Sequence, residues 1–362
     1  MYWLPAILIL PYSFLLLKIY RNLLKVQPFH TSIPPSTHVS VIIACRNEQN
    51  KLPSLLACLS AQDYPGELYE VIIVDDNSTD KTFEIASEQS LAVRLIVLRN
   101  QGNGKKEAIR TGVNSSAGRL IITTDADCIT GKNWIKTIAS FFEKNNPDMI
   151  ICPVQLTGSR SFFGWFQELE FLSLQGVTAG SAMAGNAIMC NGANLAFTRD
   201  TYLKHMENLQ FDLNTGDDVF LLHSLKRQTG SKIMWLESRD AIVTTSSSPT
   251  LKTFLLQRKR WISKWSGYSD RFTILTGILT FTAILLQIAA LVSLLINISF
   301  LWLFMNIIIL KSIPDFLILY NTAARYGKTR LMRWFLPAQL IYPFYVMSVL
   351  MYSPAEAPDR VN

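Results

Sequence analysis

The chain has 362 residues, of which 49% are hydrophobic and 17% are charged, and its mean hydropathy is +0.22. This composition is too apolar for a disordered chain or for a highly charged nucleic-acid-binding arm. Lysine and arginine exceed aspartate and glutamate by 34 to 27, which gives a formal net charge of +7. In so apolar a chain, this basic excess is typical of the cytoplasmic flanks of membrane helices. We therefore expect an integral membrane protein of one or two folded units, without a nucleic-acid partner.

An uncharged apolar run, residues 3–17, lies near the amino terminus and is followed by Lys18, Arg21 and Lys25. A cleaved signal peptide has its positive charge before the apolar run, so the order here is reversed. We interpret residues 1–27 as an uncleaved transmembrane anchor whose charged flank stays in the cytoplasm. A buried core helix is the alternative interpretation.

The carboxyl-terminal region, residues 272–352, predicts about three further spans. Residues 272–310 carry no charge, which is enough for two spans with a tight turn at residues 297–299, and residues 335–352 form the last candidate. Lys311, Pro314 and Asp315 interrupt the pattern, so residues 313–320 either cross or lie in the interface plane.

Basic residues are concentrated on two flanks of these spans, residues 18–271 and 311–333, which predicts that both flanks are cytoplasmic and both termini external. We expect the bacterial inner membrane as the location. The five cysteines, which lack C-x-x-C spacing, predict reduced thiols in a cytosolic compartment rather than a zinc site or a disulfide framework.

Between the anchor and the later spans, residues 38–265 alternate short apolar runs with helical stretches. The runs, typical of buried parallel strands, are 39–45, 70–74, 93–98 and 120–124, and the helices are predicted at 48–62, 80–89 and 105–115. This order predicts an α/β fold with a doubly wound, mostly parallel sheet that binds ligands beyond the carboxyl ends of its strands. Residues 28–35 are a plausible hinge to the anchor.

Acidic residues follow two of these strands. Asp75 and Asp76 end the second strand, and Asp125 and Asp127 end the fourth. Because alternate side chains of a strand share one side, the D-x-D spacing can direct both carboxylates to one hard cation, which would bind a diphosphate. Acids are also common in ordinary turns, but two acidic clusters at the same end of neighbouring strands favour the metal site.

Two further segments carry candidate ligand groups. The run N-Q-G-N-G-K-K, which ends in Lys105 and Lys106, opens a predicted helix and suits an anionic or nucleotide ligand, although it lacks the G-K-[ST] ending of a Walker loop. By itself it is also compatible with a flexible basic turn. Asp217 and Asp218 begin another predicted helix, where an acid is either a cap or a general base whose pKa is raised by burial and by its neighbour.

The segment Q-R-K-R-W lies on a predicted helix just before the internal spans. Gln257, Arg260 and Trp261 share one face because of their i, i+3, i+4 spacing, whereas Lys252 and Lys259 point away. An amide, a guanidinium and an indole suit a diphosphate beside a sugar ring. A juxtamembrane basic helix with an interfacial tryptophan is the alternative.

Six segments occur in one order over residues 39–261: VSVIIACRNEQNKL, EVIIVDDNSTDKT, TTDAD, NGANLAF, TGDDVFL and QRKRW. This ordered set resembles the membrane-integrated family 2 glycosyltransferases, the group that includes cellulose, chitin and hyaluronan synthases and ceramide glucosyltransferase. The resemblance implies a GT-A fold, a nucleotide-sugar donor that is usually UDP-linked, Mg²⁺ or Mn²⁺, a lipid or polysaccharide acceptor, and inversion at the anomeric carbon.

The resemblance also implies roles for individual residues. The uridine would be held by Ala44, Glu48, Asp75 or Asp76, and Lys105 or Lys106. Asp125 would face the donor, Asp127 and Asp125 the metal, and Asp218 would be the general base. Gln257, Arg260 and Trp261 would contact the diphosphate and the acceptor. The family has Glu before the base, whereas this chain has Asp217, and the membrane part is smaller than in the large processive synthases.

Other functions fit less well. A dinucleotide dehydrogenase needs G-x-G-x-x-G after the first strand, and a sugar nucleotidyltransferase needs a glycine-rich loop there, but residues 45–48 contain no glycine. A non-catalytic membrane scaffold would keep the fold without a need for all four acidic and basic motifs.

Overall fold

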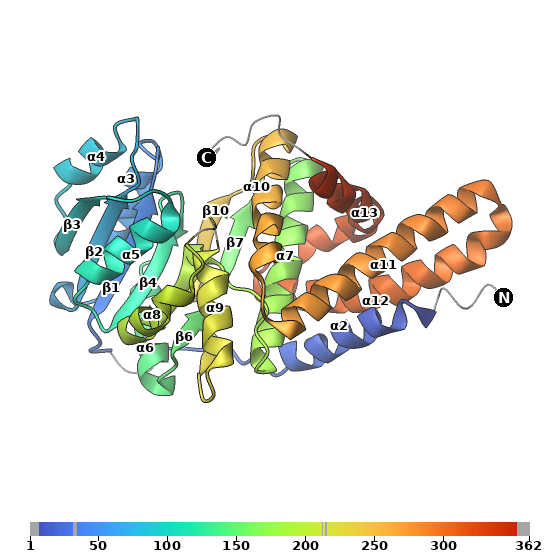
Figure 1. Ribbon diagram of the computed structural model, residues 1–362, viewed down its shortest axis with the longest axis horizontal. Helices are drawn as coiled ribbons and strands as arrows, with labels where there is room; N and C mark the ends of the chain where they lie inside the picture. Colours follow the sequence, from blue (N-terminus) through green and yellow to red (C-terminus); the bar gives the residue numbers. More distant parts are fainter. Residues whose placement is uncertain (1–6, 32–34, 212, 214–215, 353–362) are drawn as a thin grey trace.

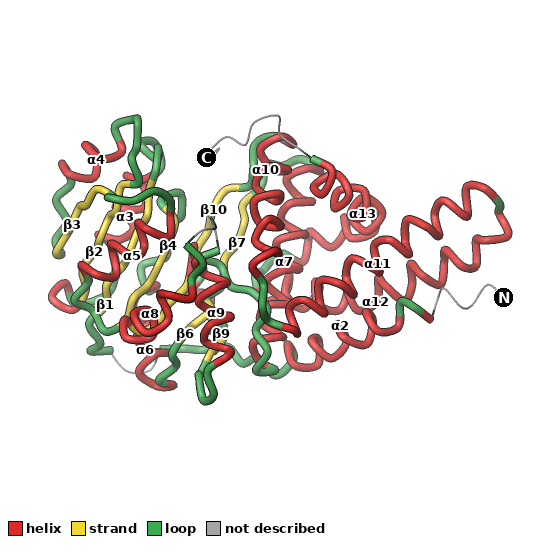
Figure 2. Tube along the Cα trace, viewed as in Figure 1, coloured by secondary structure: helices red, strands yellow, loops and turns green. Residues whose placement is uncertain are grey.

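The computed structural model describes residues 7–31, 35–211, 213 and 216–352. The strands are concentrated in one half of the molecule, and long helices occupy the other half (Figures 1 and 2). The α/β character predicted from the sequence is confirmed.

The main sheet has seven strands in the order β3-β2-β1-β4-β8-β6-β9. They are β1 Val39–Cys45, β2 Tyr69–Asp75, β3 Arg94–Arg99, β4 Leu120–Asp125, β6 Met149–Ile151, β8 Leu195–Thr198 and β9 Ile233–Trp235. The first four pair in parallel, whereas β8 is antiparallel to both β4 and β6. The sheet is therefore mostly parallel, with one reversed strand.

Strand β1 is central and explains the sheet's two cores. Its Val41 and Ile43 side chains enter the hydrophobic core on one face, and Ile42 enters the core on the other. Successive strand side chains point to opposite faces, so a strand covered on both sides needs apolar residues throughout. The edge strand β3 differs from the expectation, because its residues are only partly buried.

Helices cover both faces of this sheet, and a small second sheet lies beside it. The helices of this half are α3 Leu52–Ser60, α4 Thr82–Glu88, α5 Lys105–Ser115, α6 Trp134–Asn145, α8 Arg199–His205 and α9 Asp217–Arg227. The small sheet contains β5 Ile129–Thr130, β10 Val243–Ser246 and β7 Val154–Thr157.

Two helices connect the sheet half to the apolar helices: α7 Phe162–Met183 and α10 Leu251–Ser263. Helix α7 packs against the amino-terminal helix α2, Leu10–Leu23, through Gly180, where a Cβ would lie 2.5 Å from the Ile19 carbonyl oxygen. It also packs against α12, Leu301–Arg325, through Gly176, where a Cβ would lie 2.2 Å from Thr322 Oγ1. Small residues at these positions allow the close approach of three helices.

Within the described residues, three stretches are long and apolar enough to cross a membrane: Arg271–Ile296, Ile298–Arg325 and Thr329–Met351. They contain α11 Arg271–Ile296, α12, and α13 Phe335–Met351. The turn expected at residues 297–299 is present between α11 and α12. Part of the predicted anchor, residues 1–6, and part of the predicted hinge, residues 32–34, lie outside the described residues.

Helix α12 corrects the expected end of the second internal span. It continues without a break through Lys311 and Pro314, so the following loop begins at about Tyr326 and not at Lys311. The charge is tolerated because the Lys311 ammonium bonds to Asp315 Oδ2 at 2.8 Å and to Gln339 Oε1 at 2.8 Å. Residues 313–320, left open by the sequence, are part of this helix.

Neighbouring helices also compensate for the prolines inside the candidate spans. A proline frees the carbonyl four residues earlier, because it has no N–H. Pro314 frees the Leu310 carbonyl, which accepts a bond of 2.8 Å from Ser13 Oγ of α2. Pro343 similarly frees the Gln339 carbonyl, which accepts a bond of 3.0 Å from Gln287 Nε2 of α11. The first bond ties α2 to α12, and the second ties α11 to α13.

Candidate active site

The carboxyl ends of the central strands carry the first acidic residues of the site. In the parallel register, Cys45 of β1 lies opposite Asp75 of β2, and Ala44 lies opposite Asp125 of β4. The two acidic clusters are thus at the same edge of the sheet, as predicted. They are not on adjacent strands, however, because β1 lies between β2 and β4.

Asp75 and Asp76 are both buried, and they differ in their contacts. Asp76 Oδ1 accepts bonds from Asn100 Nδ2 at 2.7 Å and from the Gly104 N–H at 2.8 Å, so it holds the glycine-rich segment against β2. Gly104 has φ 92°, a conformation that suits glycine, just before α5. Asp75 Oδ2 accepts a bond from the Ser78 N–H at 3.2 Å, whereas its buried Oδ1 has no hydrogen-bond partner among the described residues.

The two lysines that open α5 point to different places. Lys105 forms an ion pair with Asp125. Lys106 is buried, and its ammonium donates to the carbonyls of Leu209 at 2.9 Å and Gln210 at 2.7 Å. Lys105 therefore joins the acids of the site, and Lys106 anchors the segment before α9.

Asp127 lies in a second group of polar side chains with Glu48. Its Oδ2 accepts a bond of 3.2 Å from Thr245 of β10, and Lys51 lies 3.9 Å from the same oxygen and 3.6 Å from Glu48 Oε2. Burial, followed by the charge of Asp125, raises the pKa of Asp127. Burial also raises the pKa of Glu48 to about 7, and nearby Asp127 adds to the shift while Lys51 opposes it. Acidic groups are therefore in excess around Asp127 and Glu48.

The Asp217–Asp218 pair lies beside Lys105. A Cβ added at Gly192 would lie 3.3 Å from Lys105 Nζ and 3.7 Å from Asp217 Oδ2, so a side chain at position 192 would press on the cluster. Asp218 Oδ2 accepts a bond of 3.0 Å from the Gly192 N–H, and its Oδ1 accepts bonds from the Val219 N–H at 2.8 Å and Lys264 Nζ at 3.2 Å. Both acids begin α9, as predicted.

Different surroundings shift the pKa values of the two carboxyl groups in opposite directions. Burial raises the pKa of Asp217, and the neighbouring Asp218 charge adds to burial while Lys105 opposes it. Burial also acts on Asp218, but Lys264, Lys105 and two backbone N–H groups outweigh it and hold the pKa of Asp218 below its usual value. Asp218 is therefore the more acidic of the two carboxyl groups, and the raised pKa that the sequence led us to expect of a base is found at Asp217.

Helix α10 carries the predicted Gln257, Arg260 and Trp261 face, and its end reaches the acids through Lys264. Arg260 is exposed, whereas Gln257 and Trp261 are half-buried. Ser248 donates to Gln257 Oε1 at 3.3 Å, and the Trp261 ring packs against Phe171 with a centroid distance of 6.2 Å. The exposed guanidinium is accessible to a ligand.

Several contributing residues were not singled out from the sequence: Lys51, Gly192, Thr245, Arg258 and Lys264. They come from segments far from their partners along the chain. Lys51, Gly192 and Arg258 lie in segments that the sequence pattern had marked, VSVIIACRNEQNKL, NGANLAF and QRKRW, whereas Thr245 and Lys264 do not.

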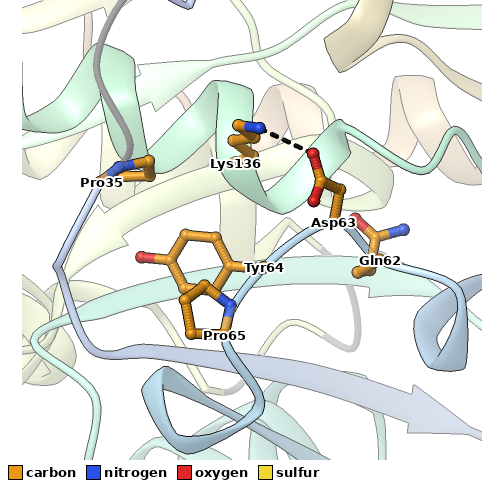
Figure 3. A pocket seen from close by; sticks show the side chains of 6 residues that line it. All are labelled: Pro35, Gln62, Asp63, Tyr64, Pro65 and Lys136. Atoms are coloured by element: carbon orange, nitrogen blue, oxygen red, sulfur yellow. Dashed lines mark hydrogen bonds and ion pairs between the residues drawn. The ribbon is translucent and has the colours of Figure 1, made fainter.

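A surface groove elsewhere on the molecule contains none of these groups. It has a volume of about 400 Å³ and is lined by Pro35, Gln62, Asp63, Tyr64, Pro65 and Lys136 (Figure 3). Lys136 and Asp63 form an ion pair of 2.7 Å beside it. It gathers no excess of either charge, so the acidic edge of the sheet is the better candidate site.

For a divalent cation, the fit rests on Asp125 and Asp127. Within the described ranges, no three His, Cys, Asp or Glu side chains converge on one metal position. Mg²⁺ commonly uses only one or two protein carboxylates together with substrate phosphates and water. The raised pKa of Asp127 reflects burial first and the charge of Asp125 second, and a bound cation would offset both. These two residues therefore suit a cation that is shared with a diphosphate.

Comparisons with known proteins point to one family of enzymes. The family model described as glycosyl transferase family 2 matches residues 40–206. An N-acetylglucosaminyltransferase from Rhizobium meliloti (strain 1021) is 27% identical over 260 residues, which cover 68% of this chain and 59% of that protein. An undecaprenyl-phosphate 4-deoxy-4-formamido-L-arabinose transferase from Edwardsiella ictaluri (strain 93-146) is 43% identical over 93 residues, which cover 25% of this chain and 29% of that protein. The chain thus spans less than two thirds of either relative.

A solved structure extends the likeness to almost the whole chain. The mannosyltransferase PcManGT from Pyrobaculum calidifontis, in complex with GDP-Man and Mn²⁺, aligns with a TM-score of 0.53 and 17% identity, covering 97% of this chain and 99% of that chain. At this identity the likeness concerns the fold. With the match over residues 40–206, it shows that this chain carries a glycosyl transferase family 2 domain with a GT-A fold.

Proposed function

We propose that the protein is an inverting glycosyltransferase that moves a sugar from a nucleotide-sugar donor, UDP-linked in the first instance, to a lipid or polysaccharide acceptor at the membrane. The observation that carries the proposal is the connected set of Asp125, Lys105, Asp217, Asp218 and Lys264 at the carboxyl edge of the sheet. In a GT-A fold this edge is where a nucleotide and a sugar would meet. The three apolar stretches support a membrane location, for which we propose a bacterial inner membrane with this domain on the cytoplasmic side.

On the donor side, Ala44, Glu48 and Asp75 would surround the uridine, with Asp76 holding the loop that closes this pocket. The unpartnered Oδ1 of Asp75 is an acceptor that a base or ribose donor would satisfy. Lys105 would exchange its present partner, Asp125, for a phosphate oxygen, and Lys106 acts through its anchoring bonds.

Asp125 and Asp127 would hold Mg²⁺ or Mn²⁺. Such an ion supplies positive charge to the diphosphate leaving group when it is bound. Arg260, exposed on α10, and Lys264 supply further positive charge from the protein, and Gln257 and Trp261 border the acceptor side.

We assign the general base to Asp218. Its pKa is held low, so it is ionised at neutral pH, and three of its four acceptor positions are occupied by donors that fix its orientation. The remaining position can take the proton of the acceptor hydroxyl. The hydroxyl oxygen then bonds to the anomeric carbon, the bond from that carbon to the diphosphate oxygen breaks on the opposite side, and the nucleoside diphosphate leaves. No covalent enzyme intermediate is needed, so an α-linked donor gives a β-linked product.

The proposal is tested with the full-length protein in purified membranes, using radiolabelled UDP- and GDP-sugars and separating lipid from polymer products. We expect one sugar to be transferred with inversion. Asp218→Asn should lower kcat by about 10²–10⁴, the usual contribution of general base catalysis, with UDP affinity retained. Arg260→Lys should lower kcat and also weaken UDP binding, because an ammonium does not reproduce a planar guanidinium clamp. A fully active Asp218→Asn variant would show that this acid only caps α9, and a protein that transfers no sugar and binds no nucleotide would be a scaffold.

A further inference from the structure

The buried arginine of α10 is Arg258, which lies between the exposed Arg260 and the half-buried Gln257 along the chain. Arg258 is 2% exposed. Its Nε donates to Glu170 Oε1 of α7 at 3.1 Å, and its Nη2 donates to Glu170 Oε2 at 2.6 Å. Two parallel charge-assisted bonds fix a guanidinium in both distance and plane. Arg258 is therefore clamped at one orientation.

The clamped guanidinium contacts two of the site residues directly. Its Nη1 donates to Gln257 Oε1, an oxygen that Ser248 also contacts at 3.3 Å. Its Cζ lies 4.2 Å from the centre of the Trp261 ring and 4.6 Å from that of Phe254. Because the Gln257 oxygen is occupied by two donors, its amide NH₂ group is the part available to a ligand oxygen. The Trp261 indole is held by the same side chain that holds the amide.

Helix α13, part of a candidate membrane span, braces the other end of this arrangement. Tyr345 donates to Glu170 Oε1 at 3.2 Å, and its ring stacks on Phe254 with a centroid distance of 5.1 Å. Lys259 of α10 also donates to the Leu350 carbonyl of α13 at 3.1 Å. The position of α10 over the site is therefore set jointly by α7 and by α13.

We propose that Arg258 is a positioning residue which, clamped by Glu170 and braced by Tyr345, holds the Gln257 amide and the Trp261 ring where the donor diphosphate and the acceptor must be aligned. This inference rests on the proposed glycosyl transfer. It makes the packing of α13, part of a candidate membrane span, a determinant of turnover, because Tyr345 and Leu350 of that helix contact Glu170, Phe254 and Lys259.

The experiment compares variants of the full-length protein in detergent or nanodiscs. Arg258→Lys keeps the charge but loses the bidentate clamp, and Glu170→Gln keeps the shape but loses the charge. Glu168→Gln is the matched control, because Glu168 lies on the same helix in a buried ion pair with Lys328, which does not involve α10. The measurements are kcat, KM for donor and acceptor, and the thermal midpoint of unfolding.

We expect kcat to fall by about 10²-fold in Arg258→Lys and Glu170→Gln, the size of effect that accompanies a misplacement of about 1 Å. The double variant should fall no further than either single variant, because both changes release the same clamp. Glu168→Gln should lose as much in thermal midpoint as Arg258→Lys and Glu170→Gln. At a temperature where it is folded, it should nevertheless retain at least about a third of the wild-type kcat. Tyr345→Phe, which removes one hydroxyl, should lower kcat about fivefold, the equivalent of one ordinary hydrogen bond.

Retention of more than about a third of kcat by Arg258→Lys would overturn the inference, and so would an equal loss in Glu168→Gln, which would mark a general packing effect. If Arg258→Lys and Glu170→Gln do not fold, Tyr345→Phe decides, and an unchanged kcat in that variant overturns the inference. A wild-type protein that neither binds a nucleotide nor transfers a sugar would instead overturn the proposed function and the inference together.

Discussion

The buried ion pair between Lys311 and Asp315 permits a quantitative test of how the apolar helices are held together. Asp315 Oδ2 accepts bonds from Lys311 at 2.8 Å and Gln339 at 2.9 Å, and its Oδ1 accepts one of 2.6 Å from Tyr12 of α2. Lys311 is 2% exposed. The substitution Asp315→Asn removes the negative charge and leaves that ammonium buried without a counter-charge.

The expected loss of stability follows from the cost of an uncompensated buried charge. Removing one partner of a buried ion pair typically costs about 3–5 kcal/mol. The three bonds to Asp315 give a similar figure, since hydrogen bonds to charged groups contribute about 1.5–3 kcal/mol each and asparagine preserves some of them. The double variant Lys311→Met, Asp315→Asn removes both charges, and replacing a buried pair by neutral groups of similar size is often close to neutral. We therefore expect the double variant to recover most of the loss.

The assay is denaturant unfolding of the detergent-solubilised protein, followed by tryptophan fluorescence. Asp63→Asn is the control, because Asp63 also forms an ion pair of 2.7 Å, with Lys136, but at the surface. Its unfolding midpoint should match that of the wild type. The reasoning is refuted if the unfolding free energy of Asp315→Asn lies within about 1 kcal/mol of the wild-type value, or if the double variant is no more stable than Asp315→Asn.

Three further outcomes are expected. Asp127→Asn should leave less than about a tenth of the activity, a loss of more than ~1.4 kcal/mol of transition-state stabilisation. Its thermal midpoint should stay level or rise, because like-charge repulsion with Asp125 is removed. Unchanged activity would exclude Asp127 as a metal ligand. Burial lowers the pKa of His223 from 6.5 to about 4. Between these pH values the imidazole is neutral in the folded protein but takes up a proton in the unfolded chain, so stability is lost as the pH falls from 6.5 towards 4. His223→Gln should reduce the loss of unfolding free energy between pH 6.5 and pH 4 by up to about 3 kcal/mol. An unchanged loss in this variant would assign the pH dependence to other groups. Gly180→Ala should cost about 1–3 kcal/mol through the contact with the Ile19 carbonyl, despite the better helix propensity of alanine, whereas Gly131→Ala, whose Cβ would have 4.0 Å of clearance, should be silent.

The sequence by itself determined the central strands and the helices next to them. The continuous apolar run of β1 matched Val39–Cys45, and α5 matched Lys105–Ser115, because burial on both faces and a glycine followed by helix-forming residues are local signals. It also determined that Asp75 and Asp125 end parallel strands at one sheet edge. Their alignment needs no further information, since parallel strands place their carboxyl ends together.

Only the tertiary structure separated Lys105 from Lys106. The two are adjacent on α5, and a helix turns by about 100° per residue, so one ammonium meets Asp125 and the other meets carbonyls before α9. In the same way, the buried arginine of the Q-R-K-R-W segment is Arg258, which needs Glu170 from another helix as its partner. Charge pairing over such sequence separations leaves no local pattern.

The arrangement of the apolar helices depended most on tertiary contacts. Lys311 indicated the end of a span, because an isolated ammonium in an apolar helix is costly. The helix continues because Asp315, Gln339 and Tyr12 converge on that position, and because Ser13 supplies the donor that Pro314 removes. Hydropathy measures each segment alone, whereas the cost of a buried charge is set by which side chains from other helices surround it.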